Sequence, residues 1–394
     1  MDTPICLFVI TFALLAGSST TYSDDSIKQQ ILKLFPQADS NKDGVISDAE
    51  EAAVSRQALK RYPQADKDGD GALSVAEKKA LLRQAAQRAK RNQPKARNSP
   101  SVQAKKPPTH RNVKYGKHQR QVFDIWLADT SKPTPLAVYI HGGGFRSGSK
   151  EKLSPKVLSE LLKSGISVAS INYRYKTIAP LPAAHHDARQ ALQFIRSKAG
   201  DWSIDKNRVA AFGGSAGAQI CMWLAYSDEM SNPDSSNPIE RESTRLICIA
   251  TSGGQTGNSP EYWQRMIGTF RKDASIESLA KPLNGETDPQ EIRMKTWGAN
   301  TLEEAKEISS RYAALNLISA DDPPIFMTYN MKPTDKPPTN PAQVRGWLIH
   351  HVNLGIALKE KTDELKLEAH LMYPGAKSEY RSQVDFFKAK LLEK

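Results

Sequence analysis

Cysteine and long apolar runs are both scarce in this sequence. The chain has three cysteines, at positions 6, 221 and 248, which is too few for a small domain held together by disulfides. We expect Cys221 and Cys248 to be buried small side chains rather than a disulfide pair. The apolar run at residues 5–16 is too short to span a bilayer. It suits a signal peptide over residues 1–23, so we expect no transmembrane helix and a secreted or periplasmic protein.

Acidic residues are absent from one stretch of the chain. Residues 78–123 contain 14 Lys and Arg and no Asp or Glu, which more than accounts for the net charge of +12. Residues 92–112 also carry four prolines, and this composition predicts an extended basic linker. Such a segment is typically solvated, and the alternative is contact with an anionic surface such as polysaccharide, nucleic acid or membrane.

Zinc-type clusters of His and Asp are absent from residues 113–394, which argues against metal-dependent hydrolysis there. Metal-ligand spacing is found instead in residues 24–91. Two segments, 39–50 and 66–77, match the twelve-residue calcium loop, with oxygen ligands at positions 1, 3, 5, 7 and 9 and a glutamate at position 12. The first loop supplies Asp39, Asn41, Asp43, Val45, Ser47 and Glu50, and the second supplies Asp66, Asp68, Asp70, Ala72, Ser74 and Glu77.

Glycine occupies position 6 of both loops, where the chain turns sharply, and apolar helical patterns flank the pair. The segment resembles compact paired EF-hands and dockerin-like modules. That resemblance implies a small all-α domain that binds two Ca²⁺ ions, with a structural rather than a signalling role.

Apolar strand patterns alternate with helical patterns from residue 113 onward. This alternation predicts an α/β domain with a mostly parallel sheet and helices on both faces. The expected strands are 122–127, 136–140, 166–172, 209–212, 246–250, 325–329 and 366–373, and the expected helices are 156–163, 183–198, 219–226, 354–365 and one from 383. A segment of about 70 residues before the strand at 325 shows neither pattern clearly, and we expect it to be irregular.

Two glycine-rich turns follow predicted strands and therefore fall at the same edge of the sheet. Residues 213–217 read Gly-Gly-Ser-Ala-Gly between a strand and a helix, the pattern of a nucleophile elbow that exposes Ser215. Residues 141–145 read His-Gly-Gly-Gly-Phe after the strand at 136–140. Backbone N–H groups of such a loop, with that of the residue after the serine, form an oxyanion hole.

These stretches, with DDPPIFMTYN at 321–330 and YPGA at 373–376, make residues 113–394 similar to α/β-hydrolases of the HGGG-bearing, hormone-sensitive-lipase-like esterase group. The resemblance implies Ser215 as the nucleophile. It implies oxyanion donors at Gly142, Gly143 and Ala216, with Gly144 as a further candidate, and assigns His141 a role in shaping the loop.

The remaining catalytic residues depart from the family pattern. The order of the family predicts an acid after the strand at 325–329, which points to Asp335, and a histidine after the last strand. That histidine is missing, because the chain continues Pro-Gly-Ala-Lys-Ser-Glu. His350 and His351 are the leading substitutes, and we favour His351 because it is nearer to the next helix. A site without any catalytic histidine is the second alternative, and His185 and His186 are the third.

Two functions follow from this reasoning. The first is an exported serine carboxylesterase that hydrolyses an acetyl or short-chain acyl ester, on a small molecule or a polysaccharide, through an acyl-enzyme. The second is a catalytically inactive relative that serves as a calcium-stabilised carbohydrate- or protein-binding module. Four aromatic residues are candidates either for a substrate pocket or for the core: Tyr262, Trp263, Phe270 and Trp297.

Overall fold

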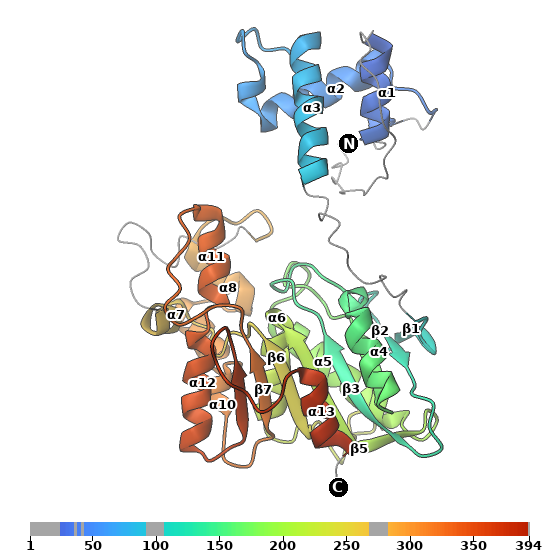
Figure 1. Ribbon diagram of the computed structural model, residues 1–394, viewed down its shortest axis with the longest axis vertical. Coiled ribbons are helices and arrows are strands. Elements are labelled where there is room, and N and C mark those ends of the chain that lie inside the picture. Colours follow the sequence, from blue (N-terminus) through green and yellow to red (C-terminus); the bar gives the residue numbers. More distant parts are fainter. Residues whose placement is uncertain (1–23, 35–37, 41–42, 92–105, 268–282, 393–394) are drawn as a thin grey trace. The chain divides into compact units, whose positions relative to one another are not determined.

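The computed structural model describes residues 24–34, 38–40, 43–91, 106–267 and 283–392. The chain divides into two compact units, residues 1–102 and residues 103–394. Figure 1 labels the elements of both units.

The first unit contains helices and two loops. Its elements are α1 (Asp24–Leu34), α2 (Asp48–Arg61), the short 3₁₀ helix η2 (Pro63–Ala65) and α3 (Val75–Arg91). Ser47 caps α2, where its side chain accepts from the Glu50 backbone while the Glu50 carboxylate accepts from the Ser47 backbone. A small buried cluster of Ile27, Ile31, Ile46 and Leu82 holds the helices together.

The second unit is built on an eight-stranded sheet with the order β1-β2-β4-β3-β5-β6-β7-β8. The strands from β4 to β8 in this order pair in parallel, whereas β1 and β2 are antiparallel additions at one edge. The strand bounds are β1 His110–Lys114, β2 Val122–Trp126, β3 Thr134–Ile140, β4 Ser167–Ile171, β5 Ile204–Gly214, β6 Cys248–Ser252, β7 Ile325–Thr328 and β8 Ala369–Met372.

Helices pack on both faces of this sheet, as the alternating sequence pattern predicts (Figure 1). One core cluster joins a sheet face to α5 (Pro182–Ser197), α6 (Ala216–Tyr226) and α12 (Asn353–Glu364). The other joins the opposite face to α4 (Pro155–Lys163) and α13 (Gln383–Leu392). Neighbouring residues of β3 divide between the two clusters, Val138 in the first and Ala137 in the second, because successive side chains of a strand point to opposite faces.

The expectation of an irregular segment before β7 is wrong. Its described residues form α7 (Pro260–Ile267), α8 (Pro289–Trp297), α9 (Leu302–Ser310) and α10 (Ala314–Leu317). A further helix, α11 (Pro341–Ile349), ends directly before the two candidate histidines. These helices are short, so their apolar periodicity extends over too few residues to be recognised in the sequence.

The last residues of the predicted linker are part of the second unit. The Trp126 indole donates a 2.7 Å hydrogen bond to the Lys106 carbonyl, and the Leu127 backbone donates to the Thr109 hydroxyl at 3.0 Å. Residues 106–112 are therefore held on the hydrolase body, although their composition alone suggested a linker.

Candidate functional site

Ser215 occupies a strained turn between β5 and α6. Its φ of 53° lies in the left-handed region, which non-glycine residues rarely adopt and which raises the serine above the end of the sheet. Gly217 is required here, because a Cβ at this position would lie 2.0 Å from the Ile140 carbonyl oxygen. The Ser215 backbone also donates a 2.8 Å hydrogen bond to the Ser252 carbonyl of β6. The local geometry agrees with the predicted nucleophile elbow.

The glycine-rich loop after β3 lies directly against this turn. A Cβ on Gly142 would lie 2.6 Å from the Gly214 carbonyl oxygen and 3.4 Å from the Ser215 Cβ. Gly143 adopts a φ of 120°, which places its N–H in an orientation that other residues do not reach easily. No hydrogen bond within the described chain uses the backbone N–H groups of Gly142, Gly143, Gly144 or Ala216. These donors are available to an oxyanion beside the serine.

His350, rather than the favoured His351, is brought to the serine. Its Nε2 lies 2.9 Å from the Ser215 hydroxyl oxygen. The histidine follows the last residue of α11, and its ring packs over Gly253, where a Cβ would lie 3.3 Å from the His350 Cδ2. This contact joins a residue after β6 to the end of a helix about 100 positions later in the chain.

The backbone of Gly346 lies one turn before His350. Burial lowers the pKa of the His350 ring, and the Gly346 backbone, which favours the protonated ring, partly offsets this effect. A neutral ring that donates through Nδ1 presents the Nε2 lone pair to the hydroxyl, as a general base requires. The nearby positive charge of Arg345 also lowers the pKa of His350.

His351 and Asp335 lie together but away from Ser215. Burial lowers the pKa of the His351 ring, and the backbone and the charge of Asp335 raise it. The ring accepts a hydrogen bond from the Asn353 backbone at 3.3 Å and packs edge-on against Trp347. The Asp335 carboxylate accepts from the Lys332 backbone at 2.9 Å. The expected pairing of Ser215 with His351 and Asp335 is therefore not the arrangement in the structure. Within the described chain, no carboxylate is hydrogen-bonded to the His350 ring.

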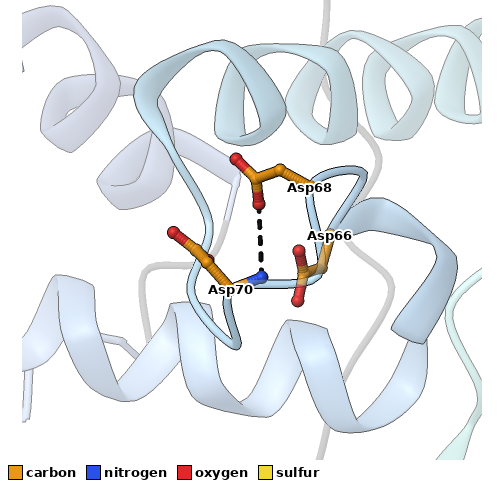
Figure 2. Close-up of side chains that lie close together, drawn as sticks. All are labelled: Asp66, Asp68 and Asp70. Atoms are coloured by element: carbon orange, nitrogen blue, oxygen red, sulfur yellow. Dashed lines mark hydrogen bonds between the residues drawn. The ribbon is translucent and has the colours of Figure 1, made fainter.

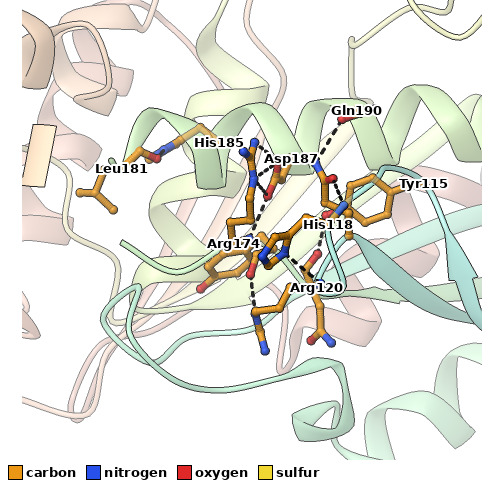
Figure 3. A network of polar contacts seen from close by, with 11 residues as sticks. Tyr115, His118, Arg120, Arg174, Leu181, His185, Asp187 and Gln190 are labelled. Atoms are coloured by element: carbon orange, nitrogen blue, oxygen red, sulfur yellow. Dashed lines mark hydrogen bonds and ion pairs between the residues drawn. The ribbon is translucent and has the colours of Figure 1, made fainter. Parts of the chain in front are cut away.

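The other candidate histidines have structural partners. Burial lowers the pKa of His185 to about 4, and its Nδ1 lies 3.0 Å from the Leu181 carbonyl. His186 lies 3.0 Å from the Tyr312 hydroxyl. Figure 3 shows His185 on α5 beside the polar network in which Arg174 forms an ion pair with the buried Asp187. Neither His185 nor His186 is therefore hydrogen-bonded to Ser215.

His141 keeps the structural role that the family resemblance implies. Its ring stacks on Tyr173 with centroids 4.2 Å apart, its Nδ1 lies 2.8 Å from the Gly142 carbonyl, and its Nε2 lies 3.3 Å from the Arg120 guanidinium. Burial lowers the pKa of His141 to about 4, so the ring is neutral near pH 7. The ring thereby fixes the first carbonyl of the glycine-rich loop.

The candidate pocket aromatics belong mostly to the interior. The Tyr262 hydroxyl lies 2.7 Å from the Thr256 hydroxyl, and the Trp263 indole donates to the Gly257 carbonyl at 2.8 Å. Trp297 is buried but borders a cavity of about 380 Å³, whose lining is Pro182, Trp223, Trp297, Ile308, Arg311 and Tyr312. None of these lining residues is one of the site residues. Phe270 lies outside the described residues.

The second predicted calcium loop has its carboxylates gathered at the loop centre. Asp66, Asp68 and Asp70 each offer a carboxylate oxygen, and these oxygens all lie within 4.8 Å of one another (Figure 2). The Glu77 carboxylate accepts from the Lys67 backbone at 2.6 Å and from the Ser74 hydroxyl at 2.7 Å. A set of carboxylates closed in this way suits a hard cation such as Ca²⁺.

In the first loop the position-12 glutamate closes the loop through the same kind of contacts. Glu50 accepts from the Ser40 backbone at 2.7 Å and from the Ser47 hydroxyl at 2.8 Å, and Asp39 accepts from the Gly44 backbone at 2.9 Å. Asn41, a predicted ligand, lies outside the described residues. The position-12 glutamate therefore spans both ends of each loop, where it can reach a central ion.

Two cysteines are buried and unpaired, as expected. Cys221 and Cys248 form no disulfide, and burial raises the pKa of both thiols. Cys6 lies outside the described residues. Among the helices of the described segments, none combines the length and the apolar character that crossing a membrane requires.

The sheet, the strained serine turn and the adjacent glycine-rich loop together define an α/β-hydrolase fold. Comparison with known families agrees, because the model of the BD-FAE family matches residues 123–343, more than half of the chain. The protein belongs to the BD-FAE family.

Individual relatives resemble shorter parts of the chain. Esterase LipC of Mycobacterium tuberculosis is 30% identical over 112 residues, and the alignment covers 28% of each chain. Probable carboxylesterase 6 of Arabidopsis thaliana is 38% identical over 140 residues, which cover 34% of this chain and 40% of that protein. The chain thus spans well under half the length of these relatives.

Solved structures share the fold. A truncated carbohydrate esterase from gut microbiota superposes with a TM-score of 0.51 at 18% identity, covering 73% of this chain and all of that one. A bifunctional GH43-CE protein of Bacteroides eggerthii gives a TM-score of 0.51 at 17% identity, covering 71% of this chain and 38% of that one.

Proposed function

We propose that this protein is a serine carboxylesterase whose catalytic pair is Ser215 and His350. The single observation that carries this proposal is the 2.9 Å separation between His350 Nε2 and the hydroxyl of a serine on a strained turn. A serine hydroxyl is a weak nucleophile unless an adjacent base accepts its proton. The esterase and carboxylesterase relatives support the same reaction class.

The reaction proceeds through an acyl-enzyme. Ser215 attacks the ester carbonyl while His350 Nε2 accepts its proton, and the backbone N–H groups of Gly142, Gly143 and Ala216 donate to the developing oxyanion, with Gly144 as a further donor. His350 then protonates the leaving alcohol. Water, deprotonated by the same ring, releases the acid and restores the serine.

The substrate we propose is an acetyl or short-chain acyl ester on a small molecule or a polysaccharide. The similarity to a carbohydrate esterase is a similarity of fold and does not identify the substrate. The alternative, an inactive binding module, rests on one observation: no described carboxylate is hydrogen-bonded to His350.

Hydrolysis of 4-nitrophenyl acetate tests the proposal. We expect burst or steady-state release of nitrophenolate by the wild type. We expect Ser215→Ala and His350→Ala each to lower kcat by at least about 10³-fold, because nucleophile and base act as one unit. His351→Ala is the matched control, since its ring pairs with the Asn353 backbone rather than with the serine. An inert wild type would favour the inactive alternative, whereas a Ser215→Ala variant of unchanged rate would overturn Ser215 as the nucleophile.

The N-terminal unit, in this proposal, is a pair of EF-hands that binds two Ca²⁺ ions and stabilises an exported enzyme. The carboxylates gathered in the second loop support it, as does the glutamate that closes each loop. Export is proposed from the apolar run at residues 5–16. The basic segment 78–123 is proposed to contact an anionic surface, which salt-dependent retention on a heparin column would test.

A further inference from the structure

Three cationic residues flank the loop and the helix that meet at the serine. Arg146 directly follows the glycine-rich loop, and its backbone donates to the Gly143 carbonyl at 3.1 Å. The Lys176 backbone donates to the Phe145 carbonyl at 2.8 Å, which fixes this lysine against the same loop. Arg345 lies on α11, one residue before Gly346, the residue whose backbone favours protonation of His350. The glycine-rich loop, the turn after β4 and the helix α11 thus each contribute one cation.

The three charges are close enough to affect one another. Burial and the charges of Arg146 and Arg345 lower the pKa of Lys176 to about 8. Burial and Arg146 lower the pKa of Arg345, and Arg345 in turn lowers that of His350. The three cations are therefore linked electrostatically to His350 through Arg345.

Carboxylates do not neutralise two of these cations. Among the described residues, neither Lys176 nor Arg345 forms an ion pair, and the only side-chain partner of the Lys176 ammonium is the Thr296 hydroxyl at 3.5 Å. Gathering like charges in a partly buried place is unfavourable, because each positive charge disfavours the others. Some surface lysines of this chain do have an acidic partner, such as Lys295 with Glu286. Such a cluster is stabilised when an anion binds.

We propose that Lys176 and Arg345, with Arg146 beside them, form an anion subsite next to Ser215 that selects esters carrying a carboxylate. This proposal rests on the esterase function proposed above. The carboxylate of the substrate belongs either to the acyl group or to the alcohol, and both would place a negative charge within reach of the ester bond. A charge-assisted hydrogen bond to a lysine or arginine then holds the substrate in position.

Matched ester pairs test the subsite. Mono-4-nitrophenyl succinate and 4-nitrophenyl butyrate differ in a charge on the acyl side, whereas 4-acetoxybenzoate and its methyl ester differ in a charge on the alcohol side. We expect kcat/KM to be at least about tenfold higher for the charged member of one pair. The pair that shows this preference identifies whether the subsite binds a carboxylate on the acyl side or on the alcohol side of the ester.

Neutralising the cations should remove the preference. Lys176→Met and Arg345→Met are each expected to lower the charged-to-neutral ratio of kcat/KM by about tenfold, mainly through KM. Lys156→Met is the matched control, since this lysine is 82% exposed on α4, on the other face of the sheet, and its ratio should equal that of the wild type. High salt should also reduce the wild-type ratio.

The outcomes separate the two proposals. Hydrolysis of the neutral esters with no preference for either charged member would overturn the anion subsite and leave the esterase intact. Failure to hydrolyse any of the four esters would overturn the esterase itself. In that case, calorimetry with succinate would test the subsite separately. Binding to the Ser215→Ala protein that is lost in Ser215→Ala/Lys176→Met would support the subsite. The absence of succinate binding to the Ser215→Ala protein would overturn it.

Discussion

The side-chain amide of Gln255 donates a 2.6 Å hydrogen bond to the carbonyl of Ile349, the last residue of α11. The same amide donates at 2.9 Å to the carbonyl of Gly253, on which the His350 ring packs. Gln255 therefore satisfies a carbonyl at the end of the helix and joins that helix to the loop after β6. One buried side chain fixes both supports of the catalytic histidine.

Removing this amide should impair turnover more than substrate binding. We expect Gln255→Ala to lower kcat by about 10- to 100-fold with little change in KM, because a displaced base fails in the transition state. Gln343→Ala, an exposed glutamine of the same helix, is the control and should match the wild type. If Gln255→Ala lowers the thermal stability and the total activity falls only because less protein is folded, kcat per folded molecule is unchanged. That result would give Gln255 a purely structural role.

Asp335 should prove dispensable for the proton relay. Its carboxylate accepts from the Lys332 backbone, and the histidine whose pKa it raises is His351 rather than His350. We expect Asp335→Asn to retain kcat within about tenfold, whereas loss of a true triad acid costs about 10⁴-fold. Measuring kcat for this variant decides the matter, and a loss of the larger size would restore the triad expected from the sequence.

The pH dependence of hydrolysis should report the His350 environment. The base must be neutral, so kcat/KM rises with pH and levels off above the pKa of His350. Burial and the charge of Arg345 disfavour the imidazolium, so we expect the inflection below pH 6.5. Removing one positive charge through Arg345→Met should move the inflection upward on a neutral ester. An inflection above pH 7 in the wild type would contradict the assigned base.

The neighbouring histidines show where sequence reasoning reached its limit. The serine turn, the glycine-rich loop and the parallel strands were predictable, because each depends on local pattern and on the rule that strand ends share one edge. The choice between His350 and His351 was not, since consecutive residues at a helix end point about 100° apart. It depends on α11, whose nine residues follow a proline-rich stretch and show no strong apolar period.

Acid should destabilise the fold through its buried neutral histidines. Burial lowers the pKa values of His141 and His185 to about 4 in the folded protein, against an ordinary value of 6.5 in the unfolded chain. Between these values the unfolded state binds more protons, so stability falls as pH decreases from 6.5 toward 4. We expect the free energy of unfolding to fall by about 2 kcal/mol per histidine between pH 7 and pH 5.

Urea unfolding at these two pH values measures this loss. His185→Phe keeps an aromatic ring beside Trp223 and Tyr312 but removes one titrating group. The variant should therefore lose about 2 kcal/mol less than the wild type over the same interval, whatever its stability at pH 7. Equal losses in the two proteins would show that His185 is not buried as a neutral ring.

Calcium binding should depend on the glutamate at position 12 of each loop, Glu50 and Glu77. In the full-length protein we expect calorimetry to detect two Ca²⁺ sites, with dissociation constants of roughly 10⁻⁴ to 10⁻³ M as in extracellular modules. Glu50→Gln and Glu77→Gln should each remove one site, because an amide cannot supply the bidentate carboxylate that both loops present. Asp48→Asn serves as the control, since this exposed carboxylate is not one of the predicted ligands and pairs with Lys28. Two sites remaining in both glutamine variants, or no heat at millimolar Ca²⁺ in the wild type, would refute the paired loops as calcium sites.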